Sequence, residues 1–385
     1  MFDDDEVLPG KDRLRGGAPG AEPKAGRSDE RFMREAIALA RSAPFTSPNP
    51  KVGAVVVRDG RVLGRGAHEG AGTPHAERRA LEGIDAGGAS LYVTLEPCCF
   101  AGRTPPCAPA VIAAGVARVV VAIQDPDPRV SGRGLAALRA AGLEVVTGVL
   151  EDEAKRVNRA YIHHRTTGRP FVVLKLALSL DGRLAAADAS SRWITSPQTR
   201  RLVHEQRLLA DAVVVGAGTV TIDDPALTVR DVHAFRQPVR VVLDAGGRVR
   251  PSAALFGPGG GGPVVVATTD ASSHEAQTSW KEAGAEVMVL ASSDQGVDLH
   301  DLLSELGRRG FLQVYCEGGA GLATSLLKLD LVDRLELHYG TKLVGGDGIS
   351  IGDLGTTTMA EAQVWSRIAL EERGGDLLVT VERAR

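Results

Sequence analysis

Aromatic residues, cysteine and net charge are all scarce in this sequence, and each shortage excludes a class of protein. Only 4% of the 385 residues are aromatic and the net charge is −3. The chain therefore lacks the stacking side chains and the basic surface of a nucleic-acid-binding protein. Four cysteines, three of them within ten residues of one another, are not the disulfide framework of a secreted domain. There is no run of about 18 apolar residues, so we expect no membrane-spanning helix. The expected partners are small molecules.

The N-terminal segment is equally poor in apolar side chains. Residues 1–27 contain an acidic run, Asp3 to Glu6, followed by scattered Gly, Pro and Lys, a composition typical of a disordered tail. A secretory signal peptide needs an apolar segment there, so we predict none and expect a cytoplasmic protein. Folded structure is predicted to start at Ser28, which suits a helix N-cap.

What the sequence does contain is a regular alternation of apolar strands and amphipathic helices. At 385 residues it is too long for one ordinary core, so two domains are expected. Over residues 28–150 the alternation indicates a first α/β domain whose sheet is covered on both faces. Residues 151–169 are predicted to be a charged helical linker, and residues 170–385 a second α/β domain. His163 and His164 in the linker are adjacent, which does not favour a shared metal.

Three potential zinc ligands lie in the stretch Pro74 to Cys107. His75 opens a predicted helix, and Cys98 follows a predicted buried strand. The next cysteines are Cys99 and Cys107. Adjacent Cys98 and Cys99 would be strained as ligands of one ion, whereas the Gly- and Pro-containing segment that follows can fold back to bring in Cys107. An imidazole and two thiolates leave the fourth position of tetrahedral zinc open, which is the catalytic arrangement.

Glu77 would give this zinc site a proton carrier. An open zinc supplies hydroxide near neutral pH, and in zinc nucleobase deaminases a His-x-Glu followed by Pro-Cys-x-x-Cys provides the acid/base. The match is partial, because Cys107 comes later than that pattern requires. Other interpretations stay open: a structural zinc, which needs four protein ligands and so Cys99 as well; a nucleic-acid deaminase, which charge and composition oppose; or ordinary cysteines beside a surface histidine.

Two glycine-containing loops distinguish the second half. Gly216 to Thr219 and Gly318 to Gly321 each follow a predicted strand, and a predicted helix follows the second of them. Such loops let a backbone approach phosphates, but they are also typical of tight turns, and the dinucleotide fingerprint Gly-x-Gly-x-x-Gly is absent. Asp223 is a site residue or a solvated turn residue. Arg207 and Arg230 are phosphate ligands or surface charges.

Longer motifs resemble the bifunctional deaminase–reductase family of riboflavin biosynthesis. They are Thr46 to Gly53, His75-Ala76-Glu77, Thr94 to Cys107, Lys175 to Gly182, Trp193 to Ser196 and Asp223 to Arg230. The long spacing from Pro-Cys to Pro-Pro-Cys is specific to that family and explains the departure from Cys-x-x-Cys. The resemblance runs from about residue 28 to the C-terminus. It implies a cytidine-deaminase-like α/β/α domain followed by a dihydrofolate-reductase-like α/β domain.

The resemblance also implies two reactions on one pathway. The first domain would use Zn²⁺ to remove ammonia hydrolytically from 2,5-diamino-6-(5-phosphoribosylamino)pyrimidin-4-one. The second would use NADPH to reduce the ribosyl side chain of the product to ribityl, and the preference over NADH rests on the resemblance alone. In the deaminase the resemblance assigns zinc binding to His75, Cys98 and Cys107, proton transfer to Glu77, and contact with the pyrimidine to Asn49.

The reductase residues that the resemblance implies form two sets. Positions matching NADPH contacts are Leu178, Trp193, Thr219, Asp223, Gly319, Ala320, Gly321, Leu322, Ala323, Thr324 and Ser325. Positions matching substrate contacts are Lys175, Ser191, Arg207, Leu227, Arg230 and Glu317, with the two arginines fitted to the phosphate. Asp223 is also the candidate for polarising or protonating the sugar.

The chain departs from the family pattern at three positions. Cys99 is not expected to bind metal, Cys316 is predicted to be a buried apolar filler, and Ala245 lacks a hydroxyl expected for one cofactor contact. His68 is predicted to be packed or solvated, with a substrate contact as the alternative. A chain with only one active domain is a further alternative, and a homo-oligomer is the usual expectation for such enzymes.

Overall fold

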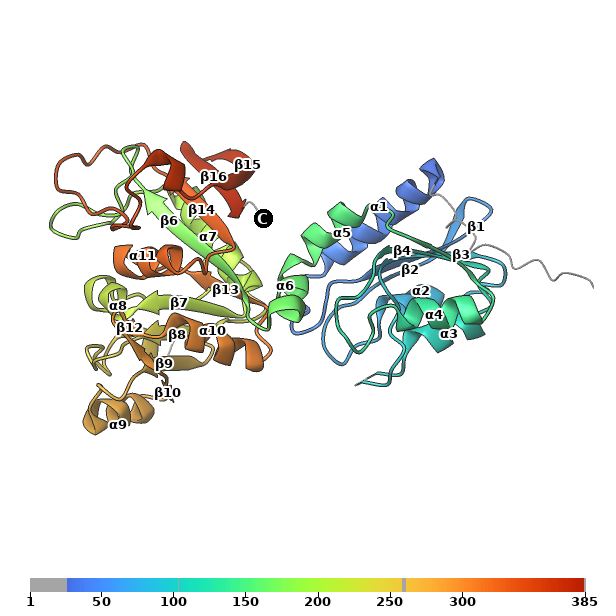
Figure 1. The fold of residues 1–385 in the computed structure, drawn as a ribbon, viewed down its shortest axis with the longest axis horizontal. Coiled ribbons are helices and arrows are strands. Elements are labelled where there is room, and N and C mark those ends of the chain that lie inside the picture. The colour runs from blue at the N-terminus through green and yellow to red at the C-terminus, as the bar shows by residue number, and fades with distance from the viewer. Residues whose placement is uncertain (1–25, 103, 258–260, 384–385) are drawn as a thin grey trace, which may run out of the picture.

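The computed structural model describes residues 26–102, 104–257 and 261–383. They form two α/β bodies, each with its own sheet and core, joined by a pair of helices (Figure 1). The tail predicted over 1–27 lies outside the described residues, apart from its last two. The prediction that Ser28 caps the first helix is wrong. Helix α1 (Arg27–Ser42) starts earlier, because the Asp29 carboxylate accepts the Gly26 amide at 2.9 Å.

The first body is a five-stranded sheet covered on both faces. Its strands, in the order β2-β1-β3-β4-β5, are β1 (Gly53–Arg58), β2 (Arg61–Ala67), β3 (Ser90–Leu95), β4 (Arg118–Ile123) and β5 (Glu144–Thr147). β1 is antiparallel to both neighbours, and β3, β4 and β5 are parallel. Figure 1 shows α1 and α5 (Glu151–Val157) on one face and α2 (Ala76–Leu81), α3 (Cys107–Ala113) and α4 (Arg133–Ala140) on the other. The alternating pattern predicts this arrangement.

Two glycines of β2 set the position of α2. A Cβ at Gly64 would lie 2.0 Å from the Ala80 carbonyl oxygen, and one at Gly66 would lie 2.1 Å from that of Ala76. Any side chain at either position would push the helix off the sheet. This close approach brings the first turn of α2, with His75 as its N-cap residue, to the segment that follows β3.

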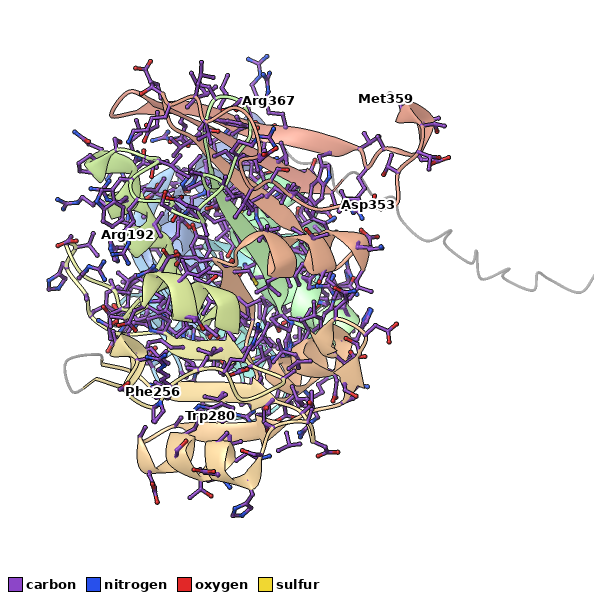
Figure 2. All side chains as sticks on the ribbon, turned by 90° about the vertical axis from the view of Figure 1, so that its left-hand side faces the viewer. Arg192, Phe256, Trp280, Asp353, Met359 and Arg367 are labelled. Carbon is purple, nitrogen blue, oxygen red and sulfur yellow. The ribbon has the colours of Figure 1, made fainter. Side chains whose placement is uncertain are left out.

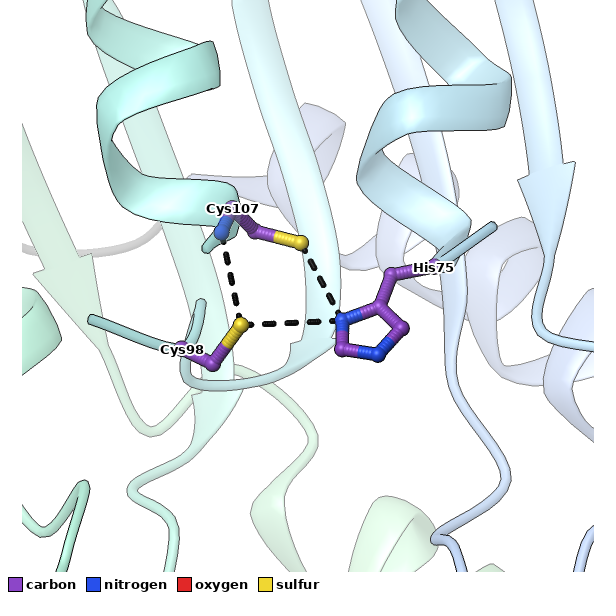
Figure 3. Close-up of side chains that lie close together, drawn as sticks. All are labelled: His75, Cys98 and Cys107. Carbon is purple, nitrogen blue, oxygen red and sulfur yellow. Dashed lines mark hydrogen bonds between the residues drawn. The ribbon is translucent and has the colours of Figure 1, made fainter. Parts of the chain in front are cut away.

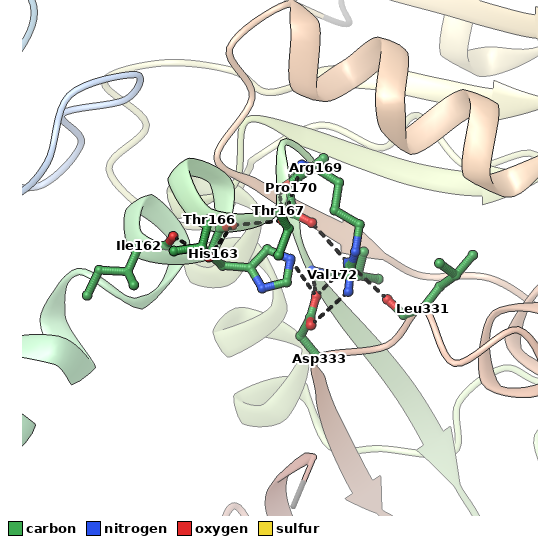
Figure 4. A network of polar contacts seen from close by, with 9 residues as sticks. All are labelled: Ile162, His163, Thr166, Thr167, Arg169, Pro170, Val172, Leu331 and Asp333. Atoms are coloured by element: carbon green, nitrogen blue, oxygen red, sulfur yellow. Dashed lines mark hydrogen bonds and ion pairs between the residues drawn. The ribbon is translucent and has the colours of Figure 1, made fainter. Parts of the chain in front are cut away.

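Helices α5 and α6 (Arg159–Thr167) join the two bodies, and α6 is anchored in the second. Figure 4 shows His163 of α6 and Arg169 converging on Asp333. Arg169 donates to both carboxylate oxygens of Asp333 (2.9 and 3.1 Å), and His163 Nε2 lies 3.6 Å from one of them. His164 Nε2 donates to the Gly307 carbonyl at 2.9 Å. The two adjacent imidazoles are buried and engage different partners.

The second body is a nine-stranded sheet in the order β10-β9-β8-β7-β13-β6-β14-β16-β15. Its strands are β6 (Phe171–Leu178), β7 (Ala212–Gly216), β8 (Val239–Leu243), β9 (Val264–Thr268), β10 (Glu286–Val289), β13 (Gln313–Cys316), β14 (Arg334–Tyr339), β15 (Trp365–Arg373) and β16 (Asp376–Arg383). The strands from β10 to β14 in this order are parallel, and β16 and β15 are antiparallel. The helices are α7 (Pro197–Leu209), α8 (Ala217–Asp223), α9 (His274–Glu282), α10 (Leu299–Arg308) and α11 (Ala320–Lys328). A small hairpin pairs β11 (Ser292–Ser293) with β12 (Gly296–Val297).

Helix α8 and strand β15 are segments of the second body that the sequence pattern misjudges. Residues after β7 are predicted as a loop but form α8, in which the Thr221 hydroxyl donates to the Ala217 carbonyl at 2.9 Å and Val220 packs into the core. Strand β15 is not predicted, because most of its side chains are exposed and no apolar face alternates along it. The prediction that Cys316 is a buried filler is confirmed by an exposed fraction of 2%.

The two ends of this sheet differ in packing. At the β10 end the Trp280 indole is fully buried beneath α9, and its Nε1–H donates to the Val249 carbonyl at 2.9 Å (Figure 2). Toward β15, Asp353 and Met359 lie on a segment that projects from the body (Figure 2), and Met359 is 88% exposed. None of the helices in the described part of the chain combines the length and apolarity needed to span a membrane.

Candidate active sites

Three elements bring His75, Cys98 and Cys107 together on the first body (Figure 3). His75 caps α2, Cys98 follows β3, and Cys107 is the first residue of α3. His75 Nδ1 lies 3.6 Å from the Sγ of Cys98 and 3.2 Å from the Sγ of Cys107. The three ligand atoms lie within 4.8 Å of one another.

The separations of these atoms fit a tetrahedral zinc ion. Zn–N bonds of about 2.0 Å and Zn–S bonds of about 2.3 Å place the ligand atoms roughly 3.5 to 3.8 Å apart. Thr104 Oγ1 lies 3.0 Å from His75 Nε2, a hydrogen bond that keeps Nδ1 turned toward the thiols. Cys99 points elsewhere, with its Sγ 3.9 Å from the Arg129 carbonyl oxygen. No fourth metal ligand joins these three among the residues that the structure describes, so the donor set is of the open, catalytic kind.

Electrostatics around the cluster favour a Cys98 thiolate. Hydrogen bonds from the Cys107 thiol, from His75 and from the Cys107 amide (3.3 Å to the Cys98 Sγ) lower the pKa of the Cys98 thiol to about 4. Burial raises the pKa of the Glu77 carboxyl to about 7. A thiolate ligand therefore lies beside a carboxyl that gains and loses a proton near neutral pH, as general acid–base catalysis requires.

A cavity of ≈ 350 Å³ opens beside the cluster, and Glu77, Asn49 and His68 line it. Asn49 Nδ2 donates to His68 Nε2 at 3.0 Å, and the His68 ring packs edge-on against His75 with centroids 5.2 Å apart. Burial lowers the pKa of His68, which keeps the ring neutral and able to accept this hydrogen bond. His68 is thus a packed histidine that also faces the cavity.

Sequence motifs miss the far wall of this cavity. It includes Asp125 and Asp127, which follow β4, and Tyr161 and Arg165 of α6. The Tyr161 hydroxyl donates to the Asp125 carboxylate at 3.0 Å, and burial raises the pKa of Asp125 to about 6. The available signal was a pair of carboxylates directly after a buried strand. Parallel neighbours β3 and β4 end at the same sheet edge, where ligand sites of α/β sheets form.

A larger cleft of ≈ 930 Å³ lies at the carboxyl ends of β7, β8 and β13. The predicted residues that line it are Ser191, Thr219, Asp223, Gly319, Ala320, Gly321, Leu322, Thr324 and Ser325. Gly319 caps α11, and its amide donates to Thr219 Oγ1 at 3.1 Å. A Cβ at Gly218 or Gly321 would meet nothing within 4 Å. An open glycine backbone at a helix N-terminus suits the phosphates of a nucleotide cofactor.

Three other predicted residues form a buried charge cluster. Arg207 of α7 donates to both carboxylate oxygens of Glu317, at 2.5 and 3.0 Å. Burial opposes ionisation of Glu317, but the charge and hydrogen bonds of Arg207, with Lys175, hold its pKa below the usual range. Burial lowers the pKa of Lys175. Glu336 is the β14 partner of Lys175 in the sheet, and it accepts a hydrogen bond from Tyr315 at 3.1 Å.

The remaining predicted side chains line neither the cleft nor this cluster. Leu178, Ala323 and Leu227 are buried in the hydrophobic cores. Trp193 and Arg230 are exposed to solvent. The structure therefore turns these five side chains to the core or to solvent, outside the cleft lining.

Sequence reasoning also misses two cations in the cleft wall, Arg248 and Lys328. Arg248 lies in the loop that follows β8, and its side chain is 70% exposed. Lys328 ends α11. Ala245, which lacks the expected hydroxyl, lines the same wall. The only sequence feature that could have indicated Arg248 is its place in the loop after a buried parallel strand. Whether that loop reaches the cleft depends on the strand order.

A chain that couples an open His-Cys-Cys metal site to a nucleotide-type cleft falls in the class of zinc-dependent deaminases fused to a reductase. Known protein families agree with this class. Residues 26–123 match the family described as cytidine and deoxycytidylate deaminase zinc-binding region, and residues 170–372 match the RibD C-terminal domain.

Individual relatives extend the match over most of the chain. Riboflavin biosynthesis protein RibD of Aquifex aeolicus is 42% identical, covering 92% of this chain and 98% of its own, and that of Escherichia coli is 40% identical, covering 91% and 98%. The solved structure of Acinetobacter baumannii RibD superposes with a TM-score of 0.84 at 36% identity, covering 93% and 99%. The deaminase/reductase of Thermotoga maritima gives 0.80 at 37%, with the same coverage.

The chain therefore belongs to the RibD family of riboflavin biosynthesis proteins. It is a bifunctional enzyme with a zinc-dependent deaminase and an NADPH-dependent reductase. The predicted fold class, a cytidine-deaminase-like domain followed by a dihydrofolate-reductase-like domain, is confirmed.

Proposed function

We propose that the first domain deaminates 2,5-diamino-6-(5-phosphoribosylamino)pyrimidin-4-one and that the second reduces the ribosyl side chain of the product. The observation that carries the proposal is the open His75-Cys98-Cys107 cluster, with Glu77 beside it, on a cavity of ≈ 350 Å³. A cavity of this size is at the small end of ligand pockets and suits a pyrimidine ring. Relatives named as riboflavin biosynthesis proteins support the substrate class.

In the deaminase, His75, Cys98 and Cys107 bind the metal. A zinc ion held there makes hydroxide available near neutral pH. Glu77 takes a proton from the attacking water and delivers it to the leaving ammonia, which suits a carboxyl whose pKa is about 7. Asn49, fixed by its hydrogen bond to His68, contacts the pyrimidine and orients the amine-bearing carbon.

In the reductase, the cofactor supplies the hydride, so the protein residues align two reactants. Thr219 and the segment 319–325 hold the cofactor at the N-terminus of α11. Leu178 and Trp193 are assigned to its site by chain position alone, because the Leu178 side chain is buried in the core and that of Trp193 is exposed. Asp223 lines the cleft at the end of α8 and polarises or protonates the open-chain sugar.

We assign the substrate of the reductase to the side chains of Lys175, Ser191, Arg207, Arg230 and Glu317. Leu227 is assigned to it by chain position alone, because its side chain is buried in the core. Glu317 already accepts hydrogen bonds from Nε and Nη2 of Arg207, and Nη1 donates to the Thr228 carbonyl, whereas Arg230 is exposed. We therefore assign the larger part of phosphate binding to Arg230, and we assign to the Lys175–Glu317 pair the fixed charges beside the sugar.

Arg248 and Lys328 supply the positive charge of the cofactor side. Both residues line the cleft together with the glycine loops. The backbone amides at the start of α11 already bind the pyrophosphate in this proposal. An additional phosphate is what separates NADPH from NADH. We propose that Arg248 contacts it, because its side chain is 70% exposed and its ion pair with Asp244 is long, at 3.9 Å.

We also propose domain boundaries, an oligomeric state and a cellular location for this chain. We divide the chain into a deaminase domain (28–150), a linker (151–169) and a reductase domain (170–385), after a tail (1–27). We also propose a homo-oligomer, because β15 is an edge strand that pairs only with β16 among the described residues. Exposed apolar side chains lie on and around it: Met359, Val364, Ile368, Leu370 and Leu377. Four free thiols support a reducing, cytoplasmic location.

A crossed pair of variants tests the two activities. Ammonia release from the diaminopyrimidine and NADPH oxidation on the deaminated product are measured for the wild type, Glu77→Gln and Asp223→Asn. Glu77→Gln should lose roughly 10³-fold in ammonia release and keep NADPH oxidation, and Asp223→Asn should do the reverse. Absence of ammonia release from zinc-loaded wild type would contradict the deaminase assignment. If the wild type does not oxidise NADPH when the deaminated product is supplied, the second domain acts on another substrate.

A further inference from the structure

The loop 44–50 belongs to the deaminase cavity but rests on the reductase domain. Pro48, Asn49 and Pro50 line the cavity. Within the loop, the Asn49 amide donates to the Thr46 carbonyl at 2.9 Å, and the Thr46 hydroxyl donates to the Asn49 carbonyl at 2.9 Å. These bonds close a tight turn, but they do not orient the turn with respect to the zinc cluster.

Arg236 of the reductase domain holds one side of this loop. Its guanidinium carbon lies 3.8 Å from the centroid of the Phe45 ring. Its Nη1 donates to the carbonyls of Leu208 and Ala210 at 2.8 and 2.7 Å, which fixes the cation at the end of α7. Both Arg236 and Phe45 are half-buried, and a cation–π contact strengthens as water is excluded from it.

Asp211 of the reductase domain holds the other side. Its carboxylate is 8% exposed and accepts the amides of Leu312 and Gln313 at 2.9 Å each. The side chain of Ser47 is also hydrogen-bonded to it. Leu312 itself packs with the hydrophobic core of the deaminase. The loop is therefore seated between two polar side chains of the other domain.

We propose that Arg236 and Asp211 are positioning residues for deamination: the reductase domain seats the loop 44–50 so that Asn49 faces the cavity. The inference rests on the proposed contact of Asn49 with the pyrimidine. Neither Arg236 nor Asp211 lines the reductase cleft. Loosening the loop should therefore weaken binding of the deaminase substrate and leave reduction unchanged.

The test uses full-length, zinc-loaded protein. Arg236→Gln and Phe45→Leu should each raise the KM for ammonia release roughly tenfold, with kcat little changed. The double variant should be no worse than either single variant, because both changes break the same contact. Phe45→Tyr keeps the ring and should keep the wild-type KM. NADPH oxidation on the deaminated product should stay at the wild-type level throughout.

Arg309→Gln is the matched control. Arg309 is an arginine of the same domain that pairs with Glu286 and Glu305, so its loss should leave the deaminase KM unchanged. A purely structural role for Arg236 would lower thermal stability or the active fraction without raising KM. An unchanged KM in Arg236→Gln, or additive effects in the double variant, would overturn the proposal.

Amide hydrogen exchange gives a readout that does not depend on activity. A peptide covering residues 43–52 should exchange faster in Arg236→Gln and in Ser47→Ala than in wild type, and Arg309→Gln should match wild type. If the wild type releases no ammonia, the proposed function is what fails, and the exchange result then decides the inference. Exchange at the wild-type rate in both Arg236→Gln and Ser47→Ala would reject the inference.

Discussion

The deaminase and reductase sites are built in opposite ways. The candidate metal ligands and Glu77 all lie within residues 75–107, on a cavity of ≈ 350 Å³, whereas the reductase cleft of ≈ 930 Å³ draws on residues from Leu184 to Asp353. A metal ion needs a few ligand atoms at fixed distances, so a short motif is enough. An organic cofactor is held by many weaker contacts over a large surface, so several strand ends have to converge.

The two sites also use buried carboxylates differently. Burial raises the pKa of Glu77 to about 7, so its protonation state changes near neutral pH. Glu317 is buried as well, but the charge of Arg207 keeps its pKa below the usual range. One carboxylate is therefore arranged to carry a proton, and the other to keep a fixed charge.

Removing zinc should produce the largest difference between the two sites. Treatment with a chelator is expected to reduce ammonia release to the background rate, because the three-ligand cluster supplies no hydroxide without its ion. NADPH oxidation on the deaminated product should not change. Metal content is measured alongside both rates, and added zinc should restore deamination. Deamination that persists in metal-free protein would contradict the catalytic role of the cluster.

Breaking the buried charge cluster should affect only the reductase. Glu317→Gln leaves Arg207 without its bidentate partner, and we expect kcat/KM for NADPH oxidation to fall roughly 100-fold, as is usual when a preorganised charged group is lost from a site. The control is Glu286→Gln, which removes an exposed carboxylate paired with Arg309. Equal activity in both variants would show that Glu317 contributes to packing and not to the reductase reaction.

Cofactor choice should depend on Arg248. Arg248→Ala is expected to raise the KM for NADPH roughly tenfold, the cost of one charged hydrogen bond, with the KM for NADH unchanged. Arg250→Ala provides the control, because Arg250 lies in the same loop but outside the cleft lining. A parallel rise in both KM values would assign Arg248 to a phosphate that the two cofactors share.

The smallest predicted effect concerns the stability of the deaminase domain alone. Arg118 donates to both carboxylate oxygens of Asp29 (2.7 and 3.1 Å), and its hydrogen bonds lower the pKa of Asp29 to about 2. Asp29→Asn should therefore destabilise the domain by on the order of 2 kcal/mol at pH 7. Glu144→Gln removes the other, more exposed partner of Arg118 and should cost less than about 1 kcal/mol.

The stability difference between wild type and Asp29→Asn should depend on pH, because the pKa of Asp29 is lower in the folded state than in the unfolded state. A carboxyl with a lowered folded-state pKa stabilises the fold above its unfolded pKa of about 4, and this stabilisation is lost as pH falls toward 2. Denaturant unfolding of wild type and Asp29→Asn between pH 7 and pH 2 should therefore converge at low pH. A constant gap would assign the stabilisation to neutral hydrogen bonds.

Much of the deaminase could be predicted from the sequence because its determinants are local. The buried strands and the spacing of His75, Cys98 and Cys107 follow from residue type and position. By contrast, Ser28 was predicted as the N-cap residue, whereas Gly26 is the N-cap residue in the structure. The Asp29 carboxylate accepts the Gly26 amide, so the helix starts earlier. Helix α8 and strand β15 were missed, since small residues and exposed residues carry little periodic signal.

The sequence by itself determined the fold class, the zinc motif and the family, since periodicity and ligand spacing depend on near neighbours along the chain. Only the tertiary structure decided which distant groups meet: Asp125 with Tyr161, Arg248 at the cofactor cleft, and Phe45 beneath Arg236. Such contacts depend on strand order and on how the two domains pack. Their energy depends on burial and on the short distance between charged groups, and a residue acquires both only when the chain has folded around it.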